Sequence, residues 1–206
     1  GAVGVGVTPT SNGTLMKQIE LGAGSILAGY HATYPNTYLG TNVLFNSSGN
    51  MVYKLTDQAA MYYQDSAGIH WFQVAASGSA NSAITWTTAM NINNAGIVTK
   101  PKQPAFDAHS TSNAYSSGTS VSSLNLNATR INVGGHYNTS NDRFTAPVAG
   151  VYHFNYRTIV NGAVTTAHVR MHKNGSIIDG TDSHYTSDSA GWSTWTYSSL
   201  VVLAAN

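Results

Sequence analysis

Charge is scarce in this sequence. Asp, Glu, Lys and Arg make up 8% of its 206 residues, and the formal net charge is +1. A typical globular protein is about one quarter charged. Nucleic-acid binding needs clustered Lys and Arg to replace counterions, and a polybasic membrane contact needs a similar cluster. The sequence therefore argues against both classes of partner.

Cysteine, long apolar runs and a collagen repeat are also absent. The chain has no Cys, so it forms no disulfides and gives no indication of a redox compartment. No apolar run approaches the roughly 20 residues of a membrane-spanning helix, and no signal-peptide pattern follows Gly1. Glycine does not recur at every third position, as a collagen stalk requires. We therefore expect no membrane insertion and no collagen stalk.

Aromatic residues are plentiful instead. With 12 Tyr, 5 Phe and 4 Trp among abundant Ser, Thr, Asn and Gly, the chain is too aromatic for a disordered segment. Tyr152, Phe154 and Tyr156 alternate with polar residues, which is the period of a half-buried strand. Asn174-Gly175 is a hairpin signal. We predict an all-β chain, with strands in its second half at 124–127, 144–160, 164–173, 177–179 and 192–203.

Two prolines and two lysines stand close together between residues 100 and 105. Because proline holds the preceding residue extended, we predict a connector at 100–105. A β-rich, repetitive fibre or shaft region would precede it at 1–99, and a globular head would follow at 106–206. Three stretches of the first region each place a polar turn and a glycine ahead of a β-prone stretch, which predicts a hairpin or strand entry. These are Asn46–Val52, Asp65–Trp71 and Asn93–Val98.

Five residues of the second half stand at the spacing of the signature of the complement C1q globular-head family: Phe144, Gly150, Tyr152, Phe154 and Tyr156. Asn132 and Tyr137 also stand at the family's distances, whereas Leu126 replaces its leading Phe. Residues 106–206 therefore resemble this family. The resemblance implies a jelly-roll β-sandwich that assembles as a homotrimer, but no particular reaction. Because the family's sequences usually continue past the point matched by Asn206, two expectations stay open: C-terminal strands of the head are missing from this sequence, or another chain completes the sheet.

The first residues carry a second resemblance. Gly1–Pro9 is similar to a Gly-x-Val-Gly-Ile-Gly-Thr-Thr-x-Pro phrase that recurs in bacteriophage tail-fibre proteins. Residues 92–106 resemble the connector that leads into a globular-head tip in such fibres. This second resemblance implies a virion fibre or appendage protein.

Metal-binding patterns are weak. His168 and His172 lie on one face of the predicted strand 164–173, but strand residues four apart are about 13 Å apart and cannot ligate one ion as a pair. A site made by one His from each of three copies on a three-fold axis stays open. We expect no metal and no cofactor.

Catalytic patterns are equally weak. Asp179, Asp182 and Asp188 fall in one predicted loop region, where Asp is a favoured turn residue. Calcium binding in this loop and the paired carboxylates of a glycan hydrolase stay as alternatives. No nucleophile elbow or phosphate loop is present. We expect that the protein is not an enzyme.

Aromatic side chains give better candidates for binding. Trp192–Leu203 is apolar on both faces of a predicted strand, which indicates burial between sheets or between subunits. Tyr115 and Tyr185 lie instead in the predicted polar loops 110–119 and 182–191. Binding residues concentrate on loops held by a rigid scaffold, so these two tyrosines are the candidate ligand contacts.

The sequence as a whole predicts a virion fibre or appendage protein that attaches to a host surface through trimeric jelly-roll heads. Its partners would be further copies of itself, other virion proteins, and a host-surface glycan or protein. A secreted globular-head binding protein of lectin-like or complement-like type is the main alternative. A fibre-borne glycan hydrolase is a third. The protein would be extracellular in each case.

Overall fold

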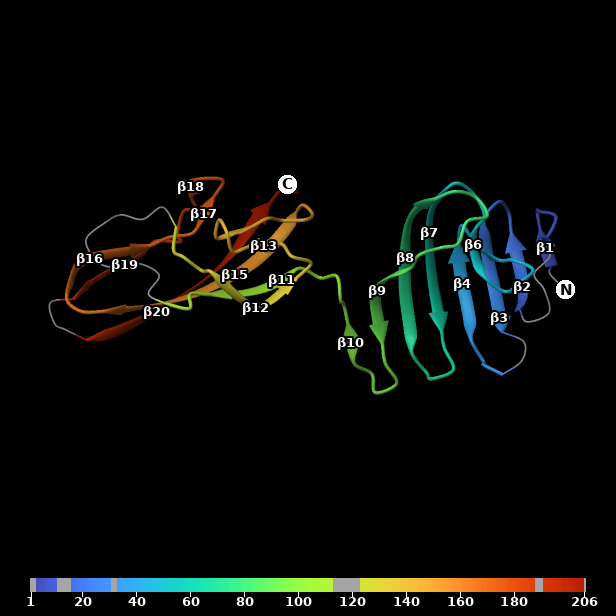
Figure 1. Cartoon of the computed structure of the whole chain (residues 1–206), viewed down its shortest axis with the longest axis horizontal. Coiled ribbons are helices and arrows are strands. Elements are labelled where there is room, and N and C mark those ends of the chain that lie inside the picture. The colour runs from blue at the N-terminus through green and yellow to red at the C-terminus, as the bar shows by residue number, and fades with distance from the viewer. Residues whose placement is uncertain (1–2, 11–15, 31–32, 113–122, 188–190, 206) are drawn as a thin grey trace. The chain divides into compact units, whose positions relative to one another are not determined.

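The computed structural model describes residues 3–10, 16–30, 33–112, 123–187 and 191–205; of residues 164, 165, 183, 185 and 187 only the backbone is described. Regular structure in these ranges is entirely β (Figure 1), so the predicted all-β fold is confirmed. The described ranges hold no helix of the length and apolarity that crossing a membrane requires. The chain divides into two compact units, residues 1–105 with 131–134 and residues 106–130 with 135–206.

The first unit, which we call the sheet unit, is built on one eight-stranded sheet. Its strands lie side by side in the order β1-β2-β3-β4-β7-β8-β9-β10 (Figure 1). β1 and β2 run parallel, and the other neighbours run antiparallel. The bounds are β1 (Val3–Val5), β2 (Met16–Leu21), β3 (Ser25–Tyr30), β4 (Thr37–Thr41), β7 (Asp57–Gln64), β8 (His70–Gly78), β9 (Thr87–Ile92) and β10 (Val98–Thr99). β5 (Val43–Phe45) and β6 (Met51–Tyr53) form a separate hairpin.

The three repeated turns share one geometry. In each, the side-chain Oδ1 of Asn46, Asp65 or Asn93 accepts hydrogen bonds from the backbone N–H groups two and four residues later, at 2.9 to 3.0 Å. The glycine three residues after it takes a φ of 76° to 80°, which only glycine adopts without strain. These turns connect β5 to β6, β7 to β8 and β9 to β10. The predicted hairpins are therefore confirmed.

One face of the large sheet is buried beneath the β5–β6 hairpin. Met16, Ile26, Tyr38 and Met61 form a hydrophobic cluster with Val43 and Phe45 of β5. The ring of Tyr38 meets the ring of Phe45 edge-on at 5.2 Å. This burial of apolar surface is the main stabilisation of the sheet unit.

β2 also buries two polar side chains, Gln18 and Glu20. The Glu20 carboxylate accepts hydrogen bonds from Lys54 Nζ at 2.9 Å, from the Thr10 backbone N–H at 2.6 Å and from Gln18 Nε2 at 3.2 Å. Burial acts to raise the pKa of Glu20, but the hydrogen bonds from Lys54 and Thr10 outweigh it and hold the pKa below its ordinary value. Glu20 is therefore a buried, ionised carboxylate that depends on Lys54.

The second unit, which we call the head unit, is built from paired strands. Its described strands form five pairs, β11 with β12, β13 with β14, β15 with β20, β16 with β19 and β17 with β18. The first residue of β11 and residues 131–133 of β12 are grouped with the sheet unit. The bounds are β11 (Ala105–His109), β12 (Ala128–Val133), β13 (Tyr137–Asn138), β14 (Arg143–Phe144), β15 (Gly150–Asn161), β16 (Val164–Val169), β17 (His172–Lys173), β18 (Ser176–Ile177), β19 (Ser183–Ser187) and β20 (Trp192–Leu203).

Several predicted strand boundaries need correction. The strand predicted at 124–127 begins only at Ala128, because the Leu126 N–H bonds the Asp142 side chain rather than a neighbouring strand. The strand predicted at 144–160 is divided between β14 and β15, since Pro147 has no N–H for a ladder. The strand predicted at 177–179 ends at Ile177. The bounds predicted at 192–203 are those of β20, and the Asn174-Gly175 turn joins β17 to β18 as predicted.

An aromatic cluster holds the head unit together around the five signature residues. Phe106 stacks on Tyr137 at 4.9 Å and on Phe144 at 5.1 Å between ring centroids. Phe144 in turn meets Tyr152 at 5.4 Å and Phe154 at 5.6 Å. The remaining signature residues take part in the same strand: Gly150 begins β15, and Tyr156 stacks on Tyr197 of β20 at 5.7 Å.

The predicted alternation along β15 is confirmed, because His153 and Asn155 are exposed whereas Phe154 points toward the aromatic cluster. The Phe154 side chain itself is half-buried. The rings of the cluster pack against one another; Tyr137 is buried, whereas Phe106, Phe144, Tyr152 and Phe154 are half-buried.

β15 and β20 pair along twelve residues each and present an outer face to solvent. Val151 lies opposite Val202, and His153 lies opposite Leu200. Leu200 is 70% exposed and Val202 is 66% exposed. The prediction that β20 is apolar on two faces is confirmed, but within one chain its outer face is not buried.

Candidate functional site

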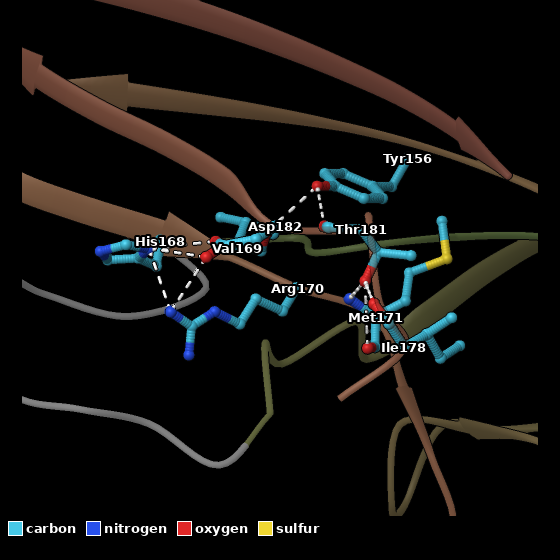
Figure 2. A network of polar contacts seen from close by, with 8 residues as sticks. All are labelled: Tyr156, His168, Val169, Arg170, Met171, Ile178, Thr181 and Asp182. Carbon is cyan, nitrogen blue, oxygen red and sulfur yellow. Dashed lines mark hydrogen bonds and ion pairs between the residues drawn. The ribbon is translucent and has the colours of Figure 1, made fainter. Parts of the chain in front are cut away.

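A polar network in the head unit begins at Thr181, whose side chain is fully buried. The Thr181 hydroxyl donates to the Ile178 carbonyl at 2.6 Å and accepts from the Met171 N–H at 3.1 Å (Figure 2). The Ile178 N–H donates to the Met171 carbonyl at 3.0 Å. These bonds fix the segment between β16 and β19. They also explain why the strand predicted at 164–173 ends early, because the Met171 N–H is used by Thr181 rather than by a strand.

Tyrosines of the long β15–β20 pair hold this segment by hydrogen bonds. The Tyr156 hydroxyl lies 3.2 Å from the Val169 carbonyl and 3.3 Å from the Thr181 carbonyl, and it donates to them (Figure 2). The Tyr197 hydroxyl donates to the Gly180 carbonyl. The signature residue Tyr156 therefore contributes to the site as well as to the core.

Four charged or titratable side chains gather next to this segment. Asp182 Oδ1 lies 3.0 Å from His168 Nδ1, and Asp182 Oδ2 lies 3.0 Å from Arg170 Nη2 (Figure 2). His184 lies directly opposite His168 in the β16–β19 pair, and the two rings stack at 4.7 Å. We call His168, Arg170, Asp182 and His184 the His-Arg-Asp cluster. Its side chains reach the surface, since those of His168, Arg170 and Asp182 are 38%, 34% and 40% exposed.

The charges of the cluster stabilise one another. The hydrogen bond from Arg170, followed by that from His168, holds the pKa of Asp182 below its ordinary value. Asp182 therefore stays ionised near neutral pH and orients both neighbours. A guanidinium has five N–H donors in a fixed plane, so Arg170 keeps donors for a ligand after binding Asp182. The arrangement suits a ligand with hydroxyl and carboxylate groups.

The two tyrosines predicted to contact ligand stay predictions. Tyr115 lies outside the described residues. Tyr185 lies on β19 with its backbone opposite Ala167, and its side chain is not described. The predicted loop 182–191 is thus wrong for residues 183–187, which form a strand because they pair with β16.

The predicted histidine and aspartate groupings also change. His172 is not on the strand of His168; it belongs to the β17–β18 hairpin, where its ring approaches the Gly175 carbonyl at 3.3 Å. Asp182 forms an ion pair rather than a turn, and Asp188 lies outside the described residues. Within the described ranges, no three His, Asp or Glu side chains converge as a metal-binding group.

The sequence did not predict that these four residues form one cluster, although their spacing gives an indication of it. His168 and Arg170 alternate with apolar Val169, while Asp182 and His184 show the same spacing. A period of two places both pairs on the same faces of strands. What the sequence does not contain is the pairing of β16 with β19, which sets His168 opposite His184.

The aromatic cluster and the paired strands of the head unit agree with a comparison to known families. Residues 105–204 match the family described as C1q domain. These residues form a C1q domain. Comparison with curated proteins and with solved structures gives no match. The C1q domain is a jelly-roll β-sandwich of a binding, non-enzymatic family, so the expected fold of the head is confirmed. The aromatic cluster and the His-Arg-Asp cluster both belong to this C1q domain.

Proposed function

We propose that this chain is a non-enzymatic attachment protein that works as a homotrimer and binds a surface ligand through its C1q domains. The presence of the C1q domain carries the proposal, because it is a binding and self-associating domain. Three copies of one weak site bind together more tightly than one, since the second and third contacts are intramolecular.

The outer face of β15 and β20 supports self-association. Its apolar members include Val151, Ile159, Trp192, Leu200 and Val202, all more than half exposed. Arg157 is the one Lys, Arg, Asp or Glu among the six β15–β20 pairs that lie on this face. A monomer would leave this apolar surface in water, whereas a subunit contact would bury it.

The His-Arg-Asp cluster is the ligand site that this proposal favours. Its exposed guanidinium and imidazoles are donors for carboxylate and hydroxyl groups, which acidic surface glycans carry. Tyr115 and Tyr185 remain proposed contacts beside it, where an aromatic ring would cover a sugar face.

We further propose that the protein is part of a virion appendage. The support is the separate sheet unit that precedes the C1q domain, together with the tail-fibre phrase at Gly1–Pro9. Electron microscopy of native particles with antibodies against the chain tests this: labelled fibres support the appendage, and label on free trimers alone supports the secreted binding protein instead.

The assembly itself makes a measurable prediction. Sedimentation of the 206-residue chain at micromolar concentration should give three times the mass of one chain. Leu200→Asp should shift that mass toward one chain, because it places a charge in the apolar face that a subunit would cover. Ile177→Asp is the matched control, since Ile177 is 48% exposed but lies on β18. A folded parent monomer would contradict the proposal.

The ligand site makes a second prediction. Arg170→Ala should weaken binding to an array of acidic glycans by about tenfold per site, the usual effect of losing a hydrogen bond to a charged group. Arg130→Ala is the matched control, because Arg130 forms an exposed ion pair with Asp107 at 2.9 Å in the same unit. Equal losses in both variants, or binding to protein receptors alone, would contradict the glycan site.

A further inference from the structure

The face of the large sheet that the β5–β6 hairpin does not cover carries a continuous apolar row. The register of the sheet places seven apolar side chains opposite one another on seven successive strands. They are Val3, Ile19, Leu27, Leu39, Tyr62, Phe72 and Met90. We call this row the apolar ladder. Its exposed members range from 37% exposed at Ile19 to 56% exposed at Val3.

β2 shows that the outer face of the sheet is more apolar than an ordinary solvent-exposed face. It turns polar Gln18 and Glu20 inward and turns Ile19 and Leu21 outward. A half-buried strand normally does the reverse. The inward polar groups are satisfied by hydrogen bonds, so the inversion leaves apolar side chains on the outer face.

The rows beside the apolar ladder are almost free of charge. One row follows Val5, Leu21 and Ser25 to Thr41, Ala60, Val74 and Thr87, and the other follows Lys17 and Gly29 to Thr37, Gln64, His70 and Ile92. Lys17 is the one Lys, Arg, Asp or Glu in these rows and the ladder. Such a face has almost no charged side chains that could form ion pairs with a charged partner. A second copy of the chain brings an equally neutral and apolar face, with no charge to repel the first.

The size of the face also fits a subunit contact. Strands lie about 4.8 Å apart and rise about 3.3 Å per residue, so seven strands and three rows cover about 600 Å². The largest apolar patch on a typical monomer is about 300 to 600 Å², and a stable interface buries about 800 Å² per partner. The face is therefore large enough to form most of an interface.

We propose that the apolar ladder packs against the ladder of a second copy of this chain, so that the sheet units form a self-associated shaft. This contact lies in the sheet unit, outside the C1q domain. It rests on the proposed function in one respect, because the associated C1q domains would hold copies of the chain near one another. Proximity makes a modest contact sufficient, because the sheet units then meet at high effective concentration.

The absence of Cys in the chain allows a direct test. Leu39→Cys places a thiol in the middle of the ladder, and Leu55→Cys, at a 49% exposed residue in the link between β6 and β7, is the matched control. In the whole chain, maleimide labelling should be at least tenfold slower at Cys in place of Leu39 than at Cys in place of Leu55. A flexible bismaleimide should join copies through the first position and not through the second.

Each outcome decides the inference. Equal labelling rates would show an open ladder and overturn it. Slow labelling without cross-links between copies would show a different occupant and overturn it as well. If sedimentation gave the mass of three chains but the ladder cysteine were labelled rapidly, the proposed homotrimer would stand and the ladder contact would be wrong. Cross-links through the ladder that persist in Leu200→Asp would support the shaft contact even if the head contact were lost.

Discussion

Replacing Lys54 by Met lowers the free energy of unfolding of the sheet unit by about 3 to 5 kcal/mol, the usual effect of removing one partner from a buried ion pair. The Glu20 side chain is 3% exposed, and Lys54 Nζ lies 2.9 Å from its Oε2. Without that ammonium, a carboxylate remains buried with only Thr10 and Gln18 as donors. Urea unfolding followed by Trp71 and Trp86 fluorescence, in chains with Trp192 and Trp195 of the head unit replaced by Phe, measures the change in the sheet unit.

Two further variants separate charge from packing. Glu20→Gln combined with Lys54→Met should recover most of the loss, because no unpaired charge then remains buried. Arg130→Met should change stability by less than about 1 kcal/mol, since its ion pair with Asp107 is exposed. If Lys54→Met were as mild as Arg130→Met, the assignment of Glu20 as a buried anion would be wrong.

Acid titration checks the same carboxylate independently. The pKa of Glu20 is lowered in the folded state, so its ionised form stabilises the fold above the unfolded pKa of about 4.3. That stabilisation should fall as the pH drops from this value through the folded pKa. In Glu20→Gln, the acid-induced loss of stability should be smaller. An unchanged acid profile would show that other carboxyls govern it.

The sequence predicted the elements that depend on local patterns. Asn46, Asp65 and Asn93 with their glycines specify turns within six residues, and the alternation of Trp195 and Tyr197 with Thr and Ser specifies β20. The signature from Phe144 to Tyr156 specified the head fold, because its aromatic spacing reflects one shared core. These features need no knowledge of distant pairing.

The features that the sequence did not predict all depend on pairing between distant segments. The inward Glu20 needs Lys54, which lies 34 residues away. Asp182 becomes an ion-pair partner rather than a turn residue because β19 pairs with β16. The apolar ladder is likewise invisible along any one strand, since each strand contributes one of its residues. Register, rather than composition, creates these three sites.

Replacing Phe154 by Ala should destabilise the C1q domain by about 3 kcal/mol, the lower end of the range for a core Phe because its ring is half-buried. Phe154 meets Phe144 at 5.6 Å and Phe106 at 6.1 Å. Its removal takes contacts from two rings that also support Tyr137 and Tyr152. For a domain of this size, the melting temperature should fall by roughly 12 to 24 °C.

The chain has two compact units, so a melting experiment can show whether a substitution destabilises the C1q domain alone or the whole chain. Calorimetry at fixed chain concentration should show Phe154→Ala moving the transition of the C1q domain and leaving that of the sheet unit in place. Lys54→Met should do the opposite. Ile177→Ala, at a 48% exposed residue, is the control within the domain and should move neither transition by more than about 4 °C. A Phe154→Ala shift no larger than that of Ile177→Ala would mean that the aromatic cluster does not hold the domain together.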